Sequence, residues 1–279
     1  MSNYYFTLVK TNGNLDFNTF GGPLSRAVST YWCINEADKI YNWDDFKEIK
    51  IYTYDFEINN TDYTYSKQNS YYRLVPDFNF HAWPDVGIND YNELIKDIHA
   101  AGLQKYKQNK VGWIGSISHP NREILLDIGC NNKELFDFKK WGKWHYDINK
   151  RNINYDKYEV SDFMSTPDLI KTYSILIDVE GEGYSGRLKH LLWSHRPLLL
   201  QDRQHKEYFF EYLKEWEHYI PVKQDLSDLV EKTEWCLNNY SEALKIAENA
   251  YQFAKIYLTR EACYALWDKI IAEHINLTN

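Results

Sequence analysis

The sequence has few cysteines and no long apolar run. Its four cysteines are far apart and form no Cys-x-x-Cys pair: Cys33, Cys130, Cys236 and Cys263. This spacing argues against a zinc ribbon or a redox motif, so reduced and buried thiols are expected. No stretch approaches the ~20 apolar residues of a membrane-spanning helix, and the first residues lack the charged-then-apolar pattern of a secretory signal. These absences favour a cytoplasmic protein without a transmembrane segment.

Excess positive charge is also absent. The 32 Lys and Arg against 40 Asp and Glu give a net charge of −8, and neither end carries a block of charge. This balance argues against a general nucleic-acid-binding role. The chain has no Gly-x-Ser-x-Gly elbow, which argues against a serine hydrolase, and no histidine spacing typical of a metal site.

Aromatic residues, by contrast, are abundant, at 17% with 24 Tyr and 10 Trp. Sugar-binding clefts favour such rings, although large aromatics mostly fill cores. The length of 279 residues suits one large domain or two of ordinary size.

The periodicity predicts strands that alternate with helices. Residues 1–48 have no regular pattern. Short apolar runs predict strands at 49–53, 111–114, 175–179, 198–200 and 218–222, and helical spacing occurs at 90–107, 122–128, 225–237, 241–257 and 260–274. An aromatic-rich helix is expected between the last two strands. Alternation of this kind predicts an α/β fold with a mostly parallel sheet and helices at the C-terminal end.

Two strand–turn–helix segments carry the residues typical of phosphate binding. After the strand at 175–179 comes a glycine-rich turn, and a short helix is expected to begin near Ser185 with Arg187 in its first turn. Free backbone N–H groups, a helix dipole and a fixed guanidinium together suit a phosphate. The turn at Gly115 and Ser116, with Arg122 six residues further on, is the second such segment.

The glycine-rich turn leaves alternatives open. Gly181, Gly183 and Gly186 satisfy the dinucleotide fingerprint G-x-G-x-x-G, with Asp202 in the ribose-binding place, which makes an NAD(P)-dependent oxidoreductase a rival interpretation. The helix is cut short by Pro197, and the acids next to the first glycine would repel a pyrophosphate unless they turn away. The pair Asp178 and Glu180 also resembles the acids that hold a divalent ion on a nucleotide diphosphate.

Several segments resemble the CAP10-like, or protein O-glucosyltransferase, family of glycosyltransferases (family 90). They are YSGRLKHLL, EYFFEYLKEWEHYIPVKQDLSDL, AENAYQFAKIYLTREACYALW, WIGSISHPNREILL and, more weakly, FNFHAWPDVG. The resemblance spans residues 49–274. It implies a GT-B-like fold with two Rossmann-like lobes facing a central cleft. It also implies an enzyme that transfers glucose or xylose from a UDP-sugar with inversion, without a metal ion or other cofactor.

The family's site residues can be carried over to matching positions. Ser116 and Arg122 match the first phosphate loop, and Ser185 and Arg187 match the second, to which Gly183 and Gly186 also belong. The resemblance implies a general base at Asp55, which ends an early strand, with Asp85 in WPD as the alternative. The chain departs from the family at Ile114, where arginine is common.

The same resemblance implies that different parts of the chain have different roles. Residues 1–108 would form an acceptor-side lobe and residues 109–257 a nucleotide-sugar-binding lobe, with the helix at 258–279 packed back on the first lobe. The acceptor would be a hydroxyl of a glycan, glycolipid or glycoprotein. Bacterial and viral relatives are the nearest parallels, so the cytoplasm of a bacterium or of a virus-infected cell is the expected location.

Overall fold

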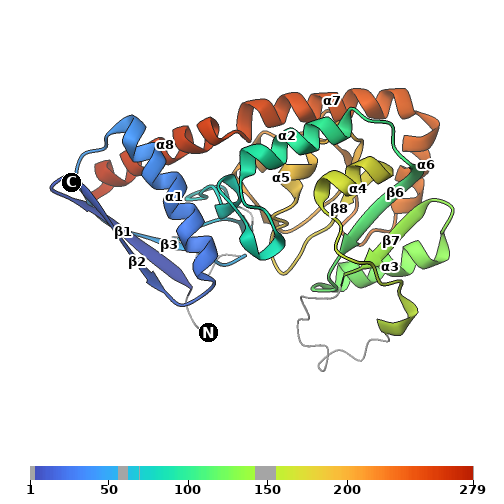
Figure 1. Cartoon of the computed structure of the whole chain (residues 1–279), viewed down its shortest axis with the longest axis horizontal. Helices are drawn as coiled ribbons and strands as arrows, with labels where there is room; N and C mark the ends of the chain where they lie inside the picture. The colour runs from blue at the N-terminus through green and yellow to red at the C-terminus, as the bar shows by residue number, and fades with distance from the viewer. Residues whose placement is uncertain (1–3, 56–61, 69, 142–154, 279) are drawn as a thin grey trace. The chain divides into compact units, whose positions relative to one another are not determined.

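The computed structural model describes residues 4–55, 62–68, 70–141 and 155–278. These residues form two compact units (Figure 1). Unit 1 consists of residues 1–94, 204–212 and 256–279, and unit 2 consists of residues 95–203 and 213–255. The last helix of the chain therefore belongs to the same compact unit as the first strands.

Unit 1 is built on a four-stranded sheet in the order β2-β1-β3-β4. Its strands are β1 (Tyr5–Thr11), β2 (Asn14–Phe20), β3 (Phe46–Tyr52) and β4 (Tyr63–Thr64). The turn between β1 and β2 is Asn12-Gly13, and both residues have positive φ, 52° and 77°. Such a two-residue turn matches the twist of an antiparallel hairpin. The carboxylate of Asp45 accepts hydrogen bonds from both turn N–H groups, which lowers its pKa.

Two long helices and several short elements complete unit 1. They are α1 (Leu24–Tyr41), α8 (Arg260–Thr278), the small sheet of β5 (Lys67–Gln68) and β10 (His205–Lys206), and the turns η1 (Phe78–Phe80), η2 (Pro84–Val86) and η5 (Tyr208–Glu211). Arg260 at the start of α8 holds this unit together. Its guanidinium donates to Phe80 O at 2.8 Å and pairs with Asp90 at 2.7 Å, and it lies over the ring of Trp32.

Unit 2 contains a five-stranded, fully parallel sheet in the order β11-β9-β8-β6-β7. The strands are β6 (Gln108–Gly115), β7 (Phe136–Lys140), β8 (Tyr173–Asp178), β9 (Leu198–Gln201) and β11 (Ile220–Val222). All six residues of β8 are buried, as a central parallel strand covered on both faces requires. The side chains of Ile175, Ile177 and Val179 point into one apolar cluster.

Helices surround this sheet. They are α2 (Tyr91–Gly102), which begins in unit 1, α3 (Pro120–Asn131), α4 (Thr166–Thr172), α5 (Leu188–Leu191), α6 (Leu229–Asn238) and α7 (Tyr240–Tyr257), with the turn η4 (Tyr155–Lys157). In Figure 1, α3 lies beside β7, and α4 lies against β6 and β8. Leu125 of α3 and Leu229 of α6 pack into the same apolar cluster as β8.

The structure confirms the mixed α/β class, the parallel sheet and the helical C-terminal segment expected for a GT-B-like protein. It differs from the expectation at two points. Residues 1–48, for which no helix or strand is predicted, contain a hairpin and an 18-residue helix. In addition, β1 pairs antiparallel with both β2 and β3, unlike the strands of a Rossmann-like lobe. For β1 and β2 the reason is the two-residue turn, which can join only antiparallel neighbours.

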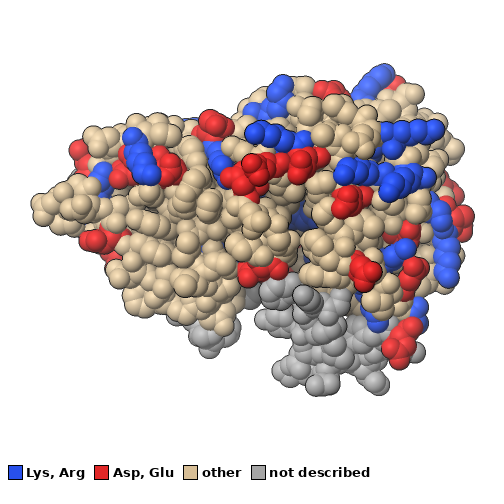
Figure 2. Space-filling model, in the orientation of Figure 1, with Lys and Arg blue, Asp and Glu red and all other residues tan. Residues whose placement is uncertain are grey.

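On the face drawn in Figure 2, acidic and basic side chains lie next to one another. Three of the four cysteines, Cys33, Cys236 and Cys263, are buried as expected, whereas Cys130 is exposed. Among the described helices, none is both long enough and apolar enough to cross a membrane.

Candidate functional site

The predicted phosphate-binding residues meet at the carboxyl edge of the parallel sheet in unit 2. The first loop follows β6 and leads into α3, so it carries Ser116 and Arg122. The second follows β8 and carries Gly183, Ser185, Gly186 and Arg187. Because β6 and β8 are neighbours in the sheet, the two loops start side by side. Ligands of open parallel sheets bind at this edge.

Arg122 connects the two loops. Its Nε donates to Glu180 O of the second loop at 2.9 Å, and its Nη1 donates to Ser116 O and to Ser118 Oγ of the first loop, both at 3.1 Å. A Cβ on Gly181 would lie 3.3 Å from Arg122 Nη2, so the backbone of the second loop passes close to the guanidinium. The position of Arg122 is thus fixed by both loops.

Arg187 makes the reverse connection. It lies on the second loop, at the N-cap of α5, and its Nη1 donates to Ile114 O at the end of β6, at 2.7 Å. Burial lowers the pKa of the Arg187 guanidinium, and the nearby carboxylate of Asp178 opposes this shift. Among the described residues this is the one hydrogen bond that the Arg187 guanidinium donates, so most of its five N–H donors are available to a ligand.

Both arginines lie over the same indole. The guanidinium carbon of Arg122 is 5.7 Å from the ring centre of Trp113, and that of Arg187 is 6.0 Å from it. The structure therefore brings together the two cations that the sequence assigns to one phosphate site. Trp113 itself is fully buried in β6 and was not among the predicted residues.

Ser185 is held by a buried ion pair. Its hydroxyl donates to Asp178 Oδ1 at 2.8 Å, and Asp178 Oδ2 lies 2.8 Å from Arg203 Nη1, with both charged side chains fully buried. Arg203 also donates to the backbone oxygen of Asp178 at 3.0 Å. Asp178 thus fixes the course of the second loop from the end of β8.

The acidic pair does not form an open metal site. Asp178 is engaged by Arg203 and Ser185, and Glu180, which is 4% exposed, accepts a hydrogen bond from Asn121 Nδ2 at 2.6 Å. Both carboxylates therefore have protein partners. Within the described ranges, no cluster of three or more His, Cys, Asp or Glu side chains is arranged to hold a metal ion.

The helix after the glycine-rich turn is much shorter than predicted. It begins at Leu188, three residues after Ser185, and has four residues. A helix of one turn adds almost no macrodipole, so the phosphate site cannot depend on its N-terminus. This length also argues against dinucleotide binding, which places a pyrophosphate on the N-terminus of a full helix. The predicted aromatic-rich helix is likewise only the 3₁₀ turn η5.

The segment YSGRLKHLL, which contains Arg187, also contains a neutral histidine. His190 is 1% exposed, and burial, together with Lys189 and Arg187, lowers its pKa to about 3. It is therefore uncharged at neutral pH. Lys189 is also buried and lies 5.5 Å from the ring centre of Tyr184.

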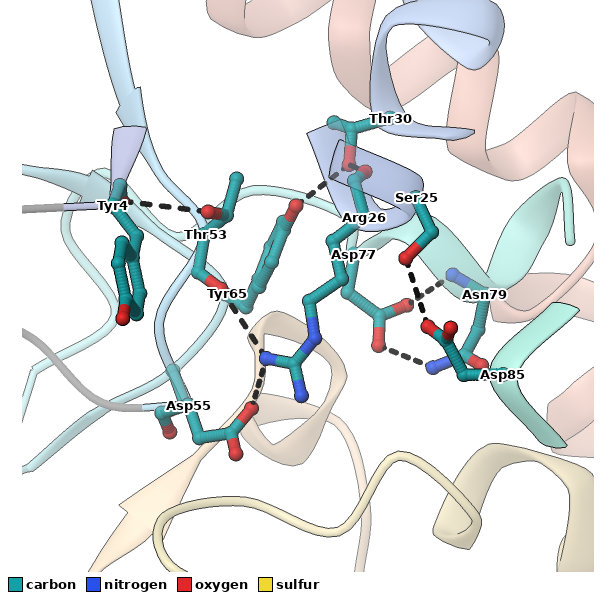
Figure 3. A network of polar contacts seen from close by, with 11 residues as sticks. Tyr4, Ser25, Arg26, Thr30, Thr53, Asp55, Tyr65, Asp77, Asn79 and Asp85 are labelled. Carbon is teal, nitrogen blue, oxygen red and sulfur yellow. Dashed lines mark hydrogen bonds and ion pairs between the residues drawn. The ribbon is translucent and has the colours of Figure 1, made fainter. Parts of the chain in front are cut away.

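The two candidate bases lie in unit 1, at the first turn of α1 (Figure 3). Asp55 Oδ1 accepts a hydrogen bond from Arg26 Nη1 at 2.5 Å, and the same nitrogen donates to Thr53 O at 3.2 Å. Asp85 Oδ2 accepts from Ser25 Oγ at 2.8 Å. Consecutive residues of one helix thus hold the two carboxylates.

Arg26 is a site residue that the sequence did not reveal. It precedes Asp55 by 29 residues in a segment without visible pattern, so only the folded chain connects the two. Its guanidinium also lies 5.0 Å from the ring centre of Phe78. Arg26 therefore contacts both the candidate base and the ring of Phe78.

Comparison with known proteins connects this arrangement to one family. Residues 40–279 match the model of glycosyl transferase family 90. Protein O-glucosyltransferase 2 of Danio rerio is 29% identical over 179 residues, which are 64% of this chain and 35% of the relative. Protein O-glucosyltransferase 1 of Homo sapiens is 26% identical over 223 residues, which are 76% of this chain and 56% of the relative.

The chain therefore spans only about a third to a half of the length of these relatives. Among solved structures, that of Anabaena Alr3699/HepE in complex with UDP-glucose is similar over 70% of this chain and 55% of its own, at 12% identity and a TM-score of 0.45. This likeness is too low to bear on function, and the family match carries the assignment.

Proposed function

Because the chain belongs to glycosyl transferase family 90, we propose that it transfers glucose or xylose from a UDP-sugar to a hydroxyl group. The acceptor would be a glycan, glycolipid or glycoprotein. The names of the relatives, protein O-glucosyltransferases, support a glucosyl donor. The rival interpretation as an NAD(P)-dependent oxidoreductase is not supported, since the family is one of glycosyltransferases and the helix after the glycine-rich turn has only four residues.

The observation that carries this proposal is the convergence of Arg122 and Arg187 over Trp113 at the carboxyl edge of the sheet. Two guanidinium groups from separate loops can bind the oxygens of a diphosphate, because each presents several N–H donors in a planar fork. In this proposal Ser116, Gly183, Ser185 and Gly186 complete the donor site. Unit 2 thus binds the UDP-sugar, and unit 1, which holds the candidate base, binds the acceptor.

The proposed reaction is a single displacement with inversion. The acceptor oxygen attacks the anomeric carbon from the face opposite UDP and loses its proton to the carboxylate of Asp55, with Asp85 as the alternative. As the new C–O bond forms, the bond to the phosphate oxygen breaks and its electron pair stays on UDP. A carboxylate is a weak base, so proton transfer accompanies bond formation.

Stabilising the departing UDP is the larger energetic demand. Negative charge grows on the phosphate oxygens in the transition state, and fixed cations aimed at that charge lower the barrier. Arg122 and Arg187 are fixed before the ligand arrives, because Arg122 donates to the backbone of the second loop and Arg187 donates to the backbone at the end of β6. In this proposal they supply the positive charge that a metal ion supplies in other transferases.

Thermal stability with added ligands tests the proposed function. A ligand at 100 times its dissociation constant adds about 2.7 kcal/mol to the free energy of unfolding, which is readily seen as a rise in Tm. UDP, UDP-glucose or UDP-xylose should raise the Tm, and NAD should not. Hydrolysis of the stabilising UDP-sugar should then persist in EDTA. Stabilisation by NAD alone, or by no UDP compound, would contradict the proposal.

A further inference from the structure

Trp113 occupies an unusual place in the site. Trp113 is fully buried in β6, two residues before the end of the strand. The first phosphate loop begins directly after the strand. A Cβ on Gly115 would lie 2.6 Å from Trp113 Cζ2, so the turn of the loop packs on the edge of the indole. The ring is therefore in contact with the loop that follows it.

The indole also supports both cations of the site. The guanidinium carbons of Arg122 and Arg187 lie 5.7 Å and 6.0 Å from its ring centre, inside the range of a cation–π interaction. Because both guanidinium carbons lie within 6.0 Å of the same ring centre, the distance between the two carbons cannot exceed twice 6.0 Å. Tryptophan is the aromatic residue that holds a cation most strongly.

Trp113 also takes part in the core of unit 2. Trp113 belongs to the apolar cluster of unit 2, together with Val111 and Ile175. In the described part of the chain its Nε1 is buried and has no hydrogen-bond partner, and leaving a buried N–H unsatisfied is costly. Phenylalanine or leucine would fill a core without this cost, but neither binds cations as well.

We propose that Trp113 is a positioning residue for the donor diphosphate: its indole face holds Arg122 and Arg187 so that both guanidinium groups serve one pocket. Arg187 Nη1 donates to Ile114 O, and the ring limits the remaining tilt of this guanidinium. This inference rests on the proposed function, because the ligand that the arginines would bind is the diphosphate of a UDP-sugar.

Two substitutions separate support of the arginines from support of the fold. Trp113→Phe keeps an aromatic face, and Trp113→Leu removes it. Trp267 of α8 provides the matched control, because it is also fully buried with an Nε1 that has no partner among the described residues, and it lies in unit 1. The control variants are Trp267→Phe and Trp267→Leu.

The readout is the affinity for UDP and for uridine, measured by calorimetry or ligand-observed NMR. Trp113→Leu should weaken UDP binding by about tenfold to a hundredfold, which is the range of two lost cation–π contacts. Uridine, which lacks phosphate, should bind as it does to the wild type, and Trp113→Phe should recover most of the UDP affinity. Both Trp267 variants should bind UDP normally. In transfer assays the KM for the UDP-sugar should rise while that for the acceptor stays unchanged.

The possible failures can be told apart. If the wild type binds no UDP, the proposed function fails and this inference fails with it. If the wild type binds UDP and Trp113→Leu binds it equally well, only the inference about Trp113 is overturned. Equal losses for UDP and uridine would also overturn it, because they would indicate general loosening of the site.

Discussion

Arg187 donates a hydrogen bond to the carbonyl oxygen of Ile114, 2.7 Å away, and so connects the loop after β8 to the end of β6. The side chain of Ile114 is buried and offers no charge to a ligand. At this position, where the resemblance to family 90 led us to expect arginine, the backbone oxygen instead anchors an arginine from the neighbouring loop. Arg187 therefore has both a structural bond and a predicted role in binding.

The first prediction concerns this arginine. Arg187→Ala should weaken UDP binding and lower the rate of transfer by about 10²–10³, because a charge-stabilising donor is lost in the transition state. Arg187→Lys should recover only part of the rate, since an ammonium group cannot make the bidentate contact. Calorimetry with UDP and initial-rate assays measure the two effects. A fully active Arg187→Ala would show that the cation takes no part in catalysis.

The second prediction separates the two candidate bases. Asp55→Asn should bind UDP as tightly as the wild type, because the change lies in unit 1, but should lose about 10²–10⁴ of the transfer rate. Asp85→Asn, whose carboxylate also contacts the first turn of α1, is the matched control and should stay active. The opposite result, with Asp55→Asn active and Asp85→Asn inactive, would assign the base to Asp85.

The third prediction concerns the buried ion pair of Asp178 and Arg203. Asp178→Ala should lower the free energy of unfolding by about 3–5 kcal/mol, because it removes a charged partner from a buried guanidinium. Urea unfolding measures the change. Lys245→Ala, which breaks the exposed pair with Glu242, is the control and should leave stability nearly unchanged. If both variants lost a similar amount of unfolding free energy, burial would not be what makes the Asp178–Arg203 pair important.

The fourth prediction concerns stability at acidic pH. The pKa of His190 is lowered from 6.5 to about 3 in the folded protein. Below pH 6.5 the His190 side chain is therefore protonated in the unfolded chain but stays neutral in the folded chain. The free energy of unfolding falls as the pH falls from 6.5 towards 3. This one group costs up to about 1.4 kcal/mol per pH unit across that window.

Unfolding measured by urea at pH 7.5, 6.0 and 5.0 tests this pH dependence. Burial also lowers the pKa of His81, His195 and His218, so these groups add to the decline. His190→Gln, whatever its stability at pH 7.5, should show a shallower decline than the wild type between pH 6 and 5. An equal slope in the two proteins would show that His190 does not stay neutral.

The sequence revealed the elements whose apolar residues dominate their pattern. The strand predicted at 175–179 corresponds to β8, and the helix predicted at 241–257 corresponds to α7, because their buried positions are large and apolar. Helix α1 escaped detection for the opposite reason. Its buried residues are mostly small or polar, namely Ala27, Ser29, Thr30, Cys33, Ile34 and Ala37, so it shows no apolar stripe. The hairpin at Asn12-Gly13 did carry a visible signal, an Asn-Gly pair between two strand-like runs.

In the candidate site, too, residues within local motifs could be predicted, and residues that depend on long-range contacts could not. Arg122 and Arg187 could be assigned from motifs within short segments, and the fold brings them to one indole. The residues that hold the site in place could not be assigned in this way. Arg26 reaches Asp55 across 29 residues, and Arg203 reaches Asp178 across 25, so their roles depend on the folded chain. Trp113 in β6 is apolar in pattern, and nothing local shows that two cations lie over it.

The composition of unit 1 has a consequence for synthesis. This unit contains the earliest strands, yet α8, which buries Trp267 and Cys263 and packs against α1, is supplied by residues near 260–278. A chain emerging from the ribosome at about 5–20 residues per second must therefore be synthesised as far as α8 before this layer can close. Unit 2 has all its residues available sooner, because it ends at residue 255. Until α8 is made, the part of unit 1 that α8 covers exposes apolar surface, and we expect chaperones to shield it.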